Sequence, residues 1–483
     1  MEKINSIISL TNDFLWTYIL IAMLIVIGVY FTWKTGFVQF KNLKEMFKLL
    51  GEGTSSKDKN QISSFQAFCM STASRVGTGN LAGVATAIAV GGPGAVFWMW
   101  LIALIGSASA FIESTLAQIY KVKDGNTFRG GPAYYMEKGL KKKWMGTLFS
   151  ILIIVCFGFA FNSVQSNTIT AAFSSSFNIN KAVLGALITI ATAIIIFGGV
   201  KSIAKISSVI VPIMAIVYIV VALFILVTNI TELPKVLKMI FENAFGVKQI
   251  IGGGMGAALL NGIKRGLFSN EAGMGSAPNA AAAATVSHPV QQGLIQTLGV
   301  FTDTLLICTA TAFIILLSSD SLVHHAASAG VNLGDIPGIE LTQIAVSSQV
   351  GSWGQYFIAF CILFFAFSSI IGNYYYGETN IQFISDKKIV LYLYRVLVIG
   401  MVFFGSIASM GLVWGLADIF MALMAILNLI AIVLLGKIAF KALKDYNKQL
   451  KEGKNPVFYA SSIPELGDEV EMWRDDESSE YIA

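Results

Sequence analysis

Long uninterrupted runs of apolar residues are the feature that most constrains how this chain can fold. A helix that crosses the hydrocarbon core of a bilayer needs about 20 predominantly apolar residues. The runs are continuous rather than alternating, so they predict helices and not the short strands of a membrane barrel. We therefore expect an all-α membrane protein with eleven transmembrane helices, at residues 14–33, 65–89, 95–119, 148–173, 182–199, 206–228, 266–286, 292–318, 353–377, 389–410 and 413–436.

The composition excludes several classes of protein. Of the 483 residues, 55% are hydrophobic and 13% are charged, whereas a soluble domain carries roughly 25% charged residues. So few charges cannot cover a soluble surface, which excludes a cytoplasmic enzyme, a nucleic-acid-binding protein and a disordered scaffold. The four cysteines stand singly and the three histidines have no metal-ligand spacing. We therefore expect no disulfide framework, no structural or catalytic metal and no cofactor.

The distribution of Lys and Arg predicts the orientation, because cytoplasmic loops carry an excess of positive residues. With the N-terminus outside, the inner segments hold 24 of the 33 Lys and Arg residues and the outer segments hold seven. We expect a multi-pass protein of the cell membrane with its C-terminus in the cytoplasm. Its expected parts are an accessory helix with a cytoplasmic loop (1–64), a first five-helix repeat (65–228), an outer interfacial segment (229–265), a second five-helix repeat (266–436) and a cytoplasmic tail (437–483) with a poorly ordered end.

Two of the expected spans contain glycine clusters near their centres. Span 65–89 has Gly-Thr-Gly-Asn at 77–80, and span 266–286 has Gly-Met-Gly-Ser at 273–276 followed by Pro278. Gly and Pro disfavour a helix by about 1 and about 3 kcal/mol relative to Ala. Interrupted backbone inside a membrane is tolerated where it lines a cavity enclosed by protein. Close helix packing through small residues is the alternative, but the adjacent polar residues favour two broken helices.

The positions of the two breaks predict a transporter. If the first helix is an accessory, the broken spans are members one and six of a ten-helix set, and they correspond in two inverted halves. Free N–H groups at a half-helix N-terminus suit a carboxylate, and free carbonyls at the opposite end suit a cation. Ser368 and Ser369 in span 353–377 offer hydroxyl ligands, unless they bond to their own helix.

Two motifs resemble a known family. The segments GGPGAVFWMWLIALIG (Gly91 to Gly106) and KRGLFSNEAGMGSAPNAAAA (Lys264 to Ala283) resemble signatures of the alanine or glycine:cation symporter family. That family belongs to the amino acid–polyamine–organocation superfamily. The resemblance covers the whole membrane part. It implies a leucine-transporter-like fold of five-plus-five inverted repeats, and Na⁺-coupled uptake of small neutral amino acids, with H⁺ in some members.

The same resemblance assigns roles by motif position. It implies that the N–H groups of Thr78 and Gly79, beside Asn80, meet the substrate carboxylate, and that Gly273, Met274 and Gly275 bound the substrate on the opposite side. The implied Na⁺ ligands are the carbonyls of Ala73, Val76 and Phe365 and the hydroxyls of Ser368 and Ser369. Arg75 stands where many superfamily members have a small residue, which argues against a second Na⁺.

Several other polar residues fall within or near the spans. Asn162 and Gln165 lie in span 148–173, which lines the site in the resembled fold, so contact with substrate competes with helix–helix hydrogen bonding as their role. An ionisable residue inside a membrane is a functional candidate, although near a span end it can equally be solvated or structural. The acids in this class are Glu113, Asp303 and Asp418.

Arg75 and Glu271 occupy equivalent positions, two residues before the first glycine of each break. An Arg alone in a membrane costs at least about 2.5–3.5 kcal/mol, so we predict an ion pair between these two residues. The alternative is that Arg75 reaches an aqueous vestibule or the substrate carboxylate while Glu271 caps the turn at Gly273.

The predicted function is a symporter that imports alanine and glycine with Na⁺ by alternating access. An H⁺-coupled amino-acid transporter is the alternative, and a passive channel is less favoured because no filter motif repeats. An enzyme within the membrane would need a facing nucleophile and base, which no span offers. ATP-driven transport would need a Walker A motif, which is absent from the sequence.

Overall fold

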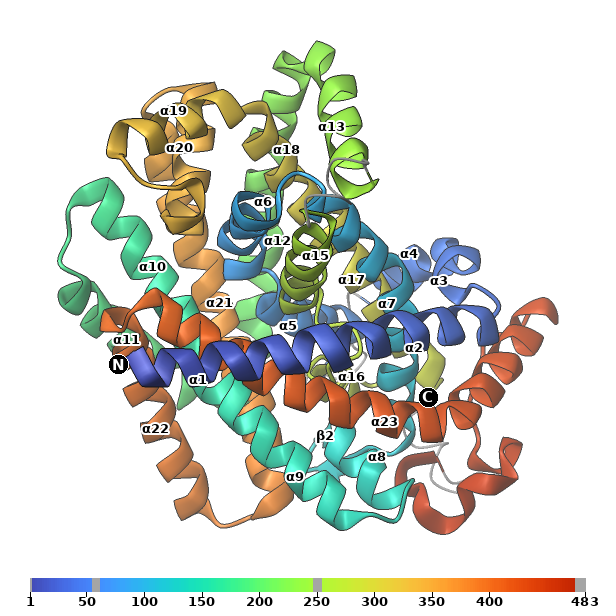
Figure 1. Ribbon diagram of the computed structural model, residues 1–483. Helices are drawn as coiled ribbons and strands as arrows, with labels where there is room; N and C mark the ends of the chain where they lie inside the picture. Colours follow the sequence, from blue (N-terminus) through green and yellow to red (C-terminus); the bar gives the residue numbers. More distant parts are fainter. Residues whose placement is uncertain (1, 54–60, 246–253, 474–483) are drawn as a thin grey trace.

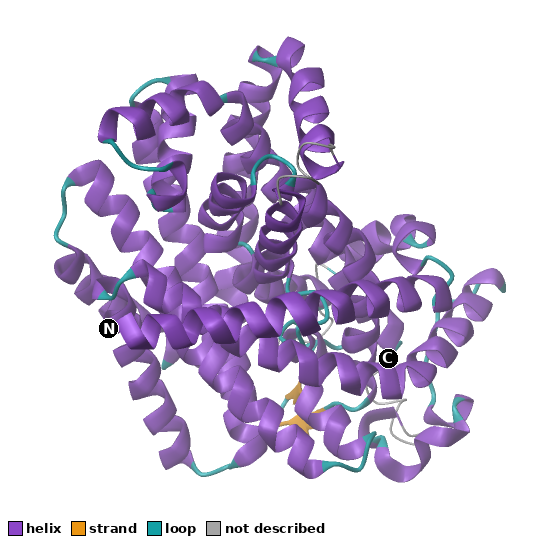
Figure 2. Cartoon of the chain, viewed as in Figure 1, coloured by secondary structure: helices purple, strands orange, loops and turns teal. Residues whose placement is uncertain are grey.

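The computed structural model describes residues 2–53, 61–245 and 254–473, and it consists almost entirely of helices (Figures 1 and 2). Two short strands, β1 (Val122–Asp124) and β2 (Thr127–Arg129), pair antiparallel with Val122 opposite Arg129.

The helices of the N-terminal half are α1 (Glu2–Asp13), η1 (Phe14–Leu20), α2 (Ile21–Lys34), α3 (Val38–Lys41), α4 (Leu43–Glu52), α5 (Ser64–Arg75), η2 (Gly79–Gly83), α6 (Val84–Gly91), α7 (Ala95–Ile119), α8 (Pro132–Lys138), α9 (Lys143–Ile153), η3 (Ile154–Phe161), α10 (Asn162–Phe177), α11 (Lys181–Ile196), α12 (Gly199–Thr228), η4 (Ile230–Glu232) and α13 (Leu233–Phe245). Those of the C-terminal half are α15 (Gly254–Asn270), α16 (Pro278–Ala283), α17 (Pro289–Val300), η5 (Phe301–Cys308), α18 (Thr309–Leu317), α19 (Ser319–Ala329), η6 (Leu333–Asp335), α20 (Gly338–Val350), α21 (Trp353–Ile384), α22 (Lys388–Ile407), α23 (Met410–Lys451), η7 (Ala460–Ser462), η8 (Pro464–Glu469) and η9 (Glu471–Trp473).

Eight helices within the described ranges are long and apolar enough to cross a membrane, so the chain is a multi-pass membrane protein. They coincide with eight of the expected spans and run over Ser6–Lys34, Ala95–Ile119, Lys143–Phe177, Ile203–Thr228, Pro289–Leu317, Trp353–Ile384, Lys388–Ile407 and Met410–Lys451. Expected span 182–199 is the shorter apolar helix α11. The other two expected spans are the glycine-containing ones, and both are interrupted.

Both interruptions fall at the expected glycine clusters. The first lies between α5 and η2, and the second between α15 and α16. A capping box at Ser63 and Gln66 begins α5, and Pro278 at the first position of α16 restarts the second helix. One expected boundary was wrong. Helix α15 begins at Gly254, so residues 254–265 belong to the second broken helix and not to an outer interfacial segment, because the apolar GAALL run extends the helix backwards.

The N-terminal helices pack along the last long helix. In Figure 1, α1 and α2 lie beside α23. Two side chains fix this arrangement: Asn12 donates to the Gly415 carbonyl at 3.0 Å, and the indole N–H of Trp16 donates to the Asp418 carbonyl at 3.2 Å. Helix α2 also packs against α7. The N-terminal helices therefore pack against α23 and α7, and Trp16 also contacts Lys264 of α15.

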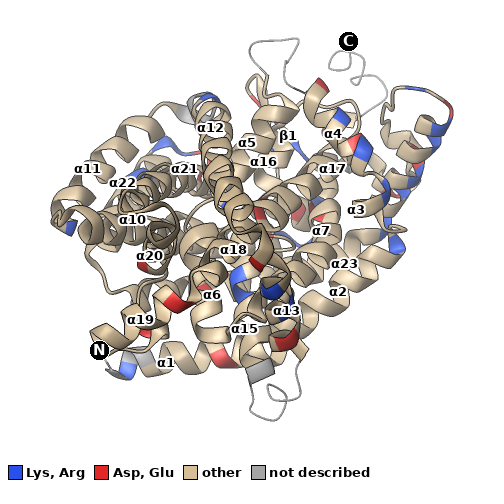
Figure 3. Cartoon of the chain, turned by 90° about the horizontal axis from the view of Figure 1, so that it is seen from above, with Lys and Arg blue, Asp and Glu red and all other residues tan. Residues whose placement is uncertain are grey.

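Lys and Arg gather around α4 and the end of α23 (Figure 3). The segments LPKVLKMIFENAF and GIELTQIAVSSQV form the helices α13 and α20. Helix α20 also packs inward, since the Thr342 hydroxyl donates to the Leu81 carbonyl at 3.0 Å. The tail end that we expected to be poorly ordered, residues 474–483, lies outside the described residues.

Candidate functional site

The first break leaves backbone groups that neutral side chains satisfy. Val76 is extended, with φ −80° and ψ 96°, and ends α5. Beyond it, the N–H of Gly77 donates to the Asn80 side-chain oxygen at 2.8 Å, and the N–H of Thr78 donates to Gln165 Oε1 at 3.0 Å. The Thr78 hydroxyl is buried and has no hydrogen-bond partner within the described part of the chain. Side-chain amide oxygens therefore accept the hydrogen bonds from the N–H groups of Gly77 and Thr78.

The second break is held by a carboxylate. Glu271, Gly273 and Gly275 have φ values of 58°, 83° and 85°, a left-handed backbone that glycine adopts without strain. The N–H groups of Gly273 and Gly275 donate to the two carboxylate oxygens of Glu113 on α7, at 3.1 and 3.0 Å. The Asn428 amide of α23 donates to the same carboxylate at 2.7 Å and to the Gly273 carbonyl at 2.9 Å.

The two breaks lie side by side. A Cβ atom at Gly79 would stand 3.1 Å from the Phe268 ring and from the Ser269 backbone, so the first break approaches α15 without intervening side chains. The Ser74 hydroxyl lies 2.7 Å from a Glu271 oxygen, and the other Glu271 oxygen accepts from the Ser276 hydroxyl at 2.6 Å. The two broken helices therefore meet at their breaks.

Most of the predicted sodium ligands converge between α5 and α21. The Ser369 hydroxyl lies 3.3 Å from the Val76 carbonyl and 3.0 Å from the Phe365 carbonyl, and Ser368 donates to the Phe365 carbonyl at 2.8 Å. Ala73 is buried one turn before the break, where Gly372 of α21 packs against neighbouring Ser74. Carbonyls and hydroxyls are the ligands that a hard cation prefers.

The predicted substrate residues divide into two groups. Thr78, Asn80 and Gln165 meet through the hydrogen bonds of the first break. Asn162 donates to the Gly158 carbonyl of its own helix at 3.1 Å, while its side-chain oxygen is buried without a partner in the described residues. Met274 is fully buried, and Gly273 and Gly275 pack against Leu429 and Phe149.

The predicted ion pair between Arg75 and Glu271 does not form. Among the described residues, no carboxylate lies within 4.0 Å of the Arg75 guanidinium, which instead donates to the Gln296 carbonyl of α17 at 3.4 Å. Glu271 accepts from Ser74 and Ser276, so hydroxyls within the breaks replace the expected cation. The repeat argument placed the two residues at equivalent positions, but Arg75 hydrogen-bonds to α17, whereas Glu271 accepts hydrogen bonds from Ser74 and Ser276.

Two acids form the polar centre of the site. Glu113 is completely buried at the second break. Asp303, in η5, accepts from the Asn80 amide at 2.7 Å and from the Ser269 and Thr304 hydroxyls at 2.8 Å each, which ties the first break to α15. Their signal in the sequence was an acid inside an apolar span. Sequence reasoning kept both as candidates but assigned neither to a break.

Comparison with known proteins identifies the family. The sodium:alanine symporter family matches residues 1–460. The chain belongs to this family. Membership identifies it as a sodium-coupled amino-acid symporter and not an enzyme.

Relatives align with nearly the whole symporter. The probable sodium/glutamine symporter GlnT of Bacillus subtilis is 57% identical over 98% of this chain and 96% of that protein. The amino-acid carrier protein AlsT of Bacillus subtilis is 54% identical over 98% of each chain. The crystal structure of MhsT in complex with L-phenylalanine superposes with a TM-score of 0.54 at 16% identity, covering 79% of this chain and 95% of that one. The symporter therefore shares its fold with MhsT.

A third acid of the symporter, Asp418, has cationic partners. Its carboxylate lies 2.6 Å from Arg265 and 3.8 Å from Lys264, both on α15. The Arg265 guanidinium also stacks over the Trp414 ring at 4.4 Å. Trp414 in turn contacts Phe268, whose ring packs on Phe161. Asp418 therefore joins α23 to the first half of the second broken helix, a structural link that its position in the sequence left open.

Proposed function

We propose that this symporter imports small neutral amino acids, alanine and glycine, together with Na⁺ by alternating access between the two broken helices. The observation that carries the proposal is the first break, where the Val76 carbonyl and the N–H groups of Gly77 and Thr78 are hydrogen-bonded to neutral side chains. Such contacts exchange for a ligand at low cost, because a neutral hydrogen bond contributes only about 0.5–1.5 kcal/mol.

Sodium is assigned to the space between α5 and α21. Its proposed ligands are the carbonyls of Ala73, Val76 and Phe365 and the hydroxyls of Ser368 and Ser369. Support comes from Ser369, whose hydroxyl already lies within 3.3 Å of two of these carbonyls. A cation there would take over the Val76 and Phe365 carbonyls, while the Ser369 hydroxyl keeps its proton, turns it away and coordinates through its oxygen. The cation would also face the C-terminal, negative end of α5.

The amino acid is assigned to the other side of the same break. The N–H groups of Thr78 and Gly79 would bind its carboxylate, with Asn80, Asn162 and Gln165 beside it. Gly273, Met274 and Gly275 would limit its size from the second break. The geometry supports this assignment because Thr78 now donates to Gln165, a carbonyl oxygen in the place of a carboxylate oxygen.

The proposed architecture is a set of eleven transmembrane helices with five-plus-five inverted repeats, the N-terminus outside and the C-terminus in the cytoplasm. Counting each broken helix once and α11 as a span extends the eight long helices to eleven. The charge distribution of the sequence supports the orientation.

Two alternatives follow from particular observations. Glutamine is a candidate substrate because a relative at 57% identity is named a probable sodium/glutamine symporter. Protons are a candidate coupling ion because buried Glu113, Glu271 and Asp303 surround the breaks without a cation within 4.0 Å in the described residues.

Uptake by purified protein in liposomes tests the proposal. Labelled alanine should accumulate under an inward Na⁺ gradient and not under an inward H⁺ gradient without Na⁺. Unlabelled glycine should compete more strongly than glutamine. Accumulation without sodium would overturn sodium coupling, and stronger competition by glutamine would replace the substrate.

A further inference from the structure

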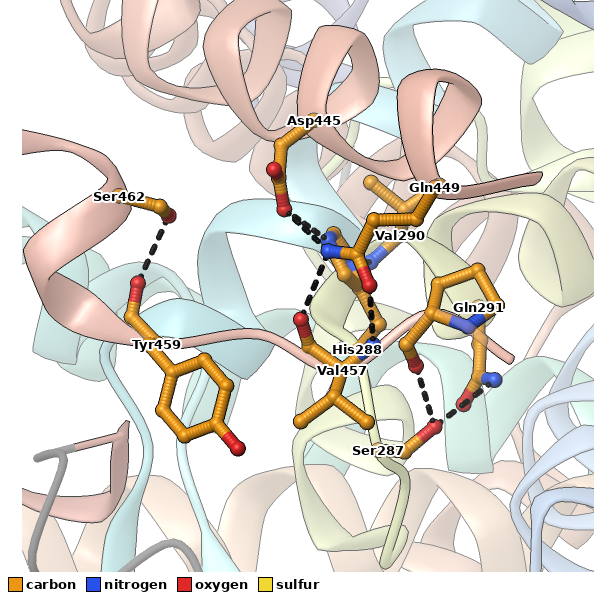
Figure 4. A network of polar contacts seen from close by, with 10 residues as sticks. Ser287, His288, Val290, Gln291, Asp445, Gln449, Val457, Tyr459 and Ser462 are labelled. Carbon is orange, nitrogen blue, oxygen red and sulfur yellow. Dashed lines mark hydrogen bonds and ion pairs between the residues drawn. The ribbon is translucent and has the colours of Figure 1, made fainter. Parts of the chain in front are cut away.

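The last described part of the chain folds back onto the inner end of the second broken helix. The backbone N–H of Phe458 donates to the Ser287 carbonyl at 3.0 Å, and the Ser287 hydroxyl donates to the Pro456 carbonyl at 2.9 Å. Val457 is bonded in both directions to the Gln449 side chain, at 2.9 and 2.8 Å (Figure 4). We call residues 456–473 the docked tail.

His288 anchors the segment between α16 and α17 to the docked tail. Its Nδ1 accepts from the Val290 N–H at 3.2 Å and its Nε2 lies 3.3 Å from an Asp445 oxygen (Figure 4). The ring also contacts the rings of Tyr446 and Phe458, with centroids 4.9 and 5.1 Å away. His288 is fully buried, so the inner end of the second broken helix is enclosed between α23 and the tail.

Ala284 and Thr285, at the inner end of the second broken helix, bond to the end of α7 and to the residues just before the first broken helix. The Ala284 carbonyl accepts from Gln118, in the last turn of α7, at 2.9 Å and from the amine of Lys121, just after α7, at 3.2 Å. The next residue, Thr285, donates its N–H to the Ile62 carbonyl at 3.0 Å, just before α5. These bonds close the inner side beneath the two breaks.

The end of the docked tail completes this closure. The Trp473 indole N–H donates to the Gln118 carbonyl at 2.9 Å, and the Lys121 amine lies 4.9 Å from the Trp473 ring. Trp473 is buried, as are Phe458, Ile463, Leu466, Val470 and Met472. The tail's ion pairs, Glu465 with Lys441 and Glu471 with Lys138, have half-exposed carboxylates, and such pairs hold weakly.

We infer that the docked tail is a latch on the inner side of the symporter: it holds Ala284 and Ile62 together through Gln118, Lys121 and Ser287, and it detaches when that side opens. The inference rests on the proposed alternating access, because inner opening must separate the inner halves of the broken helices. Residues 461–473 lie beyond the part that the family matches, so family membership assigns them no role.

Hydrogen–deuterium exchange on the full-length protein and its variants, without substrate or sodium, tests the latch. Trp473→Ala should make the backbone around Ile62 and Ala284–Val290 exchange about 5-fold faster, the loss expected for one hydrogen bond. Truncation after Tyr459 should have at least that effect. Trp473→Phe should give an intermediate value. Exchange in α20, on the proposed outer side, should not change.

A matched control is Trp353→Ala, which removes a half-exposed Trp at the start of α21. It should leave exchange at Ile62 and Ala284 unchanged. Unchanged exchange at these sites in Trp473→Ala would overturn the latch. A uniform increase that includes α20 would also overturn it, because the tail would then be a general structural support. The measurement uses no substrate, so its failure is distinct from failure of the uptake experiment.

Discussion

Both breaks leave backbone N–H groups without a partner in their own helix, and different kinds of side chain accept hydrogen bonds from them at the two breaks. At the first break, the N–H groups of Gly77 and Thr78 donate to the neutral amides of Asn80 and Gln165. At the second, the N–H groups of Gly273 and Gly275 donate to the carboxylate of Glu113. Hydrogen bonds to charged groups are stronger than neutral ones. The first break is therefore suited to exchanging partners, and the second is fixed by the scaffold.

Removing the carboxylate of the second break should have the largest effect. Glu113→Ala leaves two buried N–H groups and the Asn428 amide without their acceptor. Each unsatisfied buried donor costs about 1–3 kcal/mol, so the two N–H groups alone should lower the free energy of unfolding by roughly 2–6 kcal/mol. Thermal unfolding in detergent and uptake should both show the loss.

Two control variants distinguish the effect of losing the carboxylate from the effect of losing side-chain volume. Glu113→Gln keeps one acceptor oxygen and should recover part of the stability. Glu242→Gln, on an exposed part of α13, should behave like the wild type. Wild-type stability in Glu113→Ala would mean that the second break does not depend on this carboxylate, and the contrast between the breaks would then fail.

At the first break, substitution of the proposed sodium ligands should have an intermediate effect. Ser369→Ala removes the hydroxyl that lies between the Val76 and Phe365 carbonyls. A lost bond to a charged group costs about 1.5–3 kcal/mol, so the sodium concentration for half-maximal uptake should rise about 10- to 150-fold. Ser368→Ala should have a smaller effect, since its hydroxyl reaches only its own helix.

A matched control for the sodium measurement is Ser348→Ala on α20, whose hydroxyl donates to the Ala345 carbonyl of its own helix. It should leave the sodium dependence unchanged. Unchanged sodium dependence in Ser369→Ala, with stability preserved, would remove the sodium site from between α5 and α21.

Local sequence patterns predicted the breaks, but not the groups that satisfy them. Gly77 to Asn80 and Gly273 to Ser276 interrupt their helices as expected, because glycine and proline penalties act locally. The partners of the breaks come from distant helices: Glu113 is 160 residues from Gly273, and Gln165 is 87 residues from Thr78. The predicted direct pair of Arg75 and Glu271 is absent among the described residues, because repeat equivalence fixes the position of a residue but not its hydrogen-bond partners.

The smallest expected effect concerns the neutral amide of the first break. Gln165→Ala removes the oxygen that accepts from Thr78, and a neutral hydrogen bond contributes about 0.5–1.5 kcal/mol. If Gln165 also contacts the bound amino acid, the KM for alanine should rise about 2- to 12-fold, with stability nearly unchanged. Thr189→Ala, whose hydroxyl bonds within α11, is the control and should leave KM unchanged. Initial-rate uptake at saturating sodium measures these values. A fall in KM would show instead that Gln165 only competes with the substrate carboxylate for Thr78, and it would leave Asn80 and Asn162 as the side chains that select the substrate.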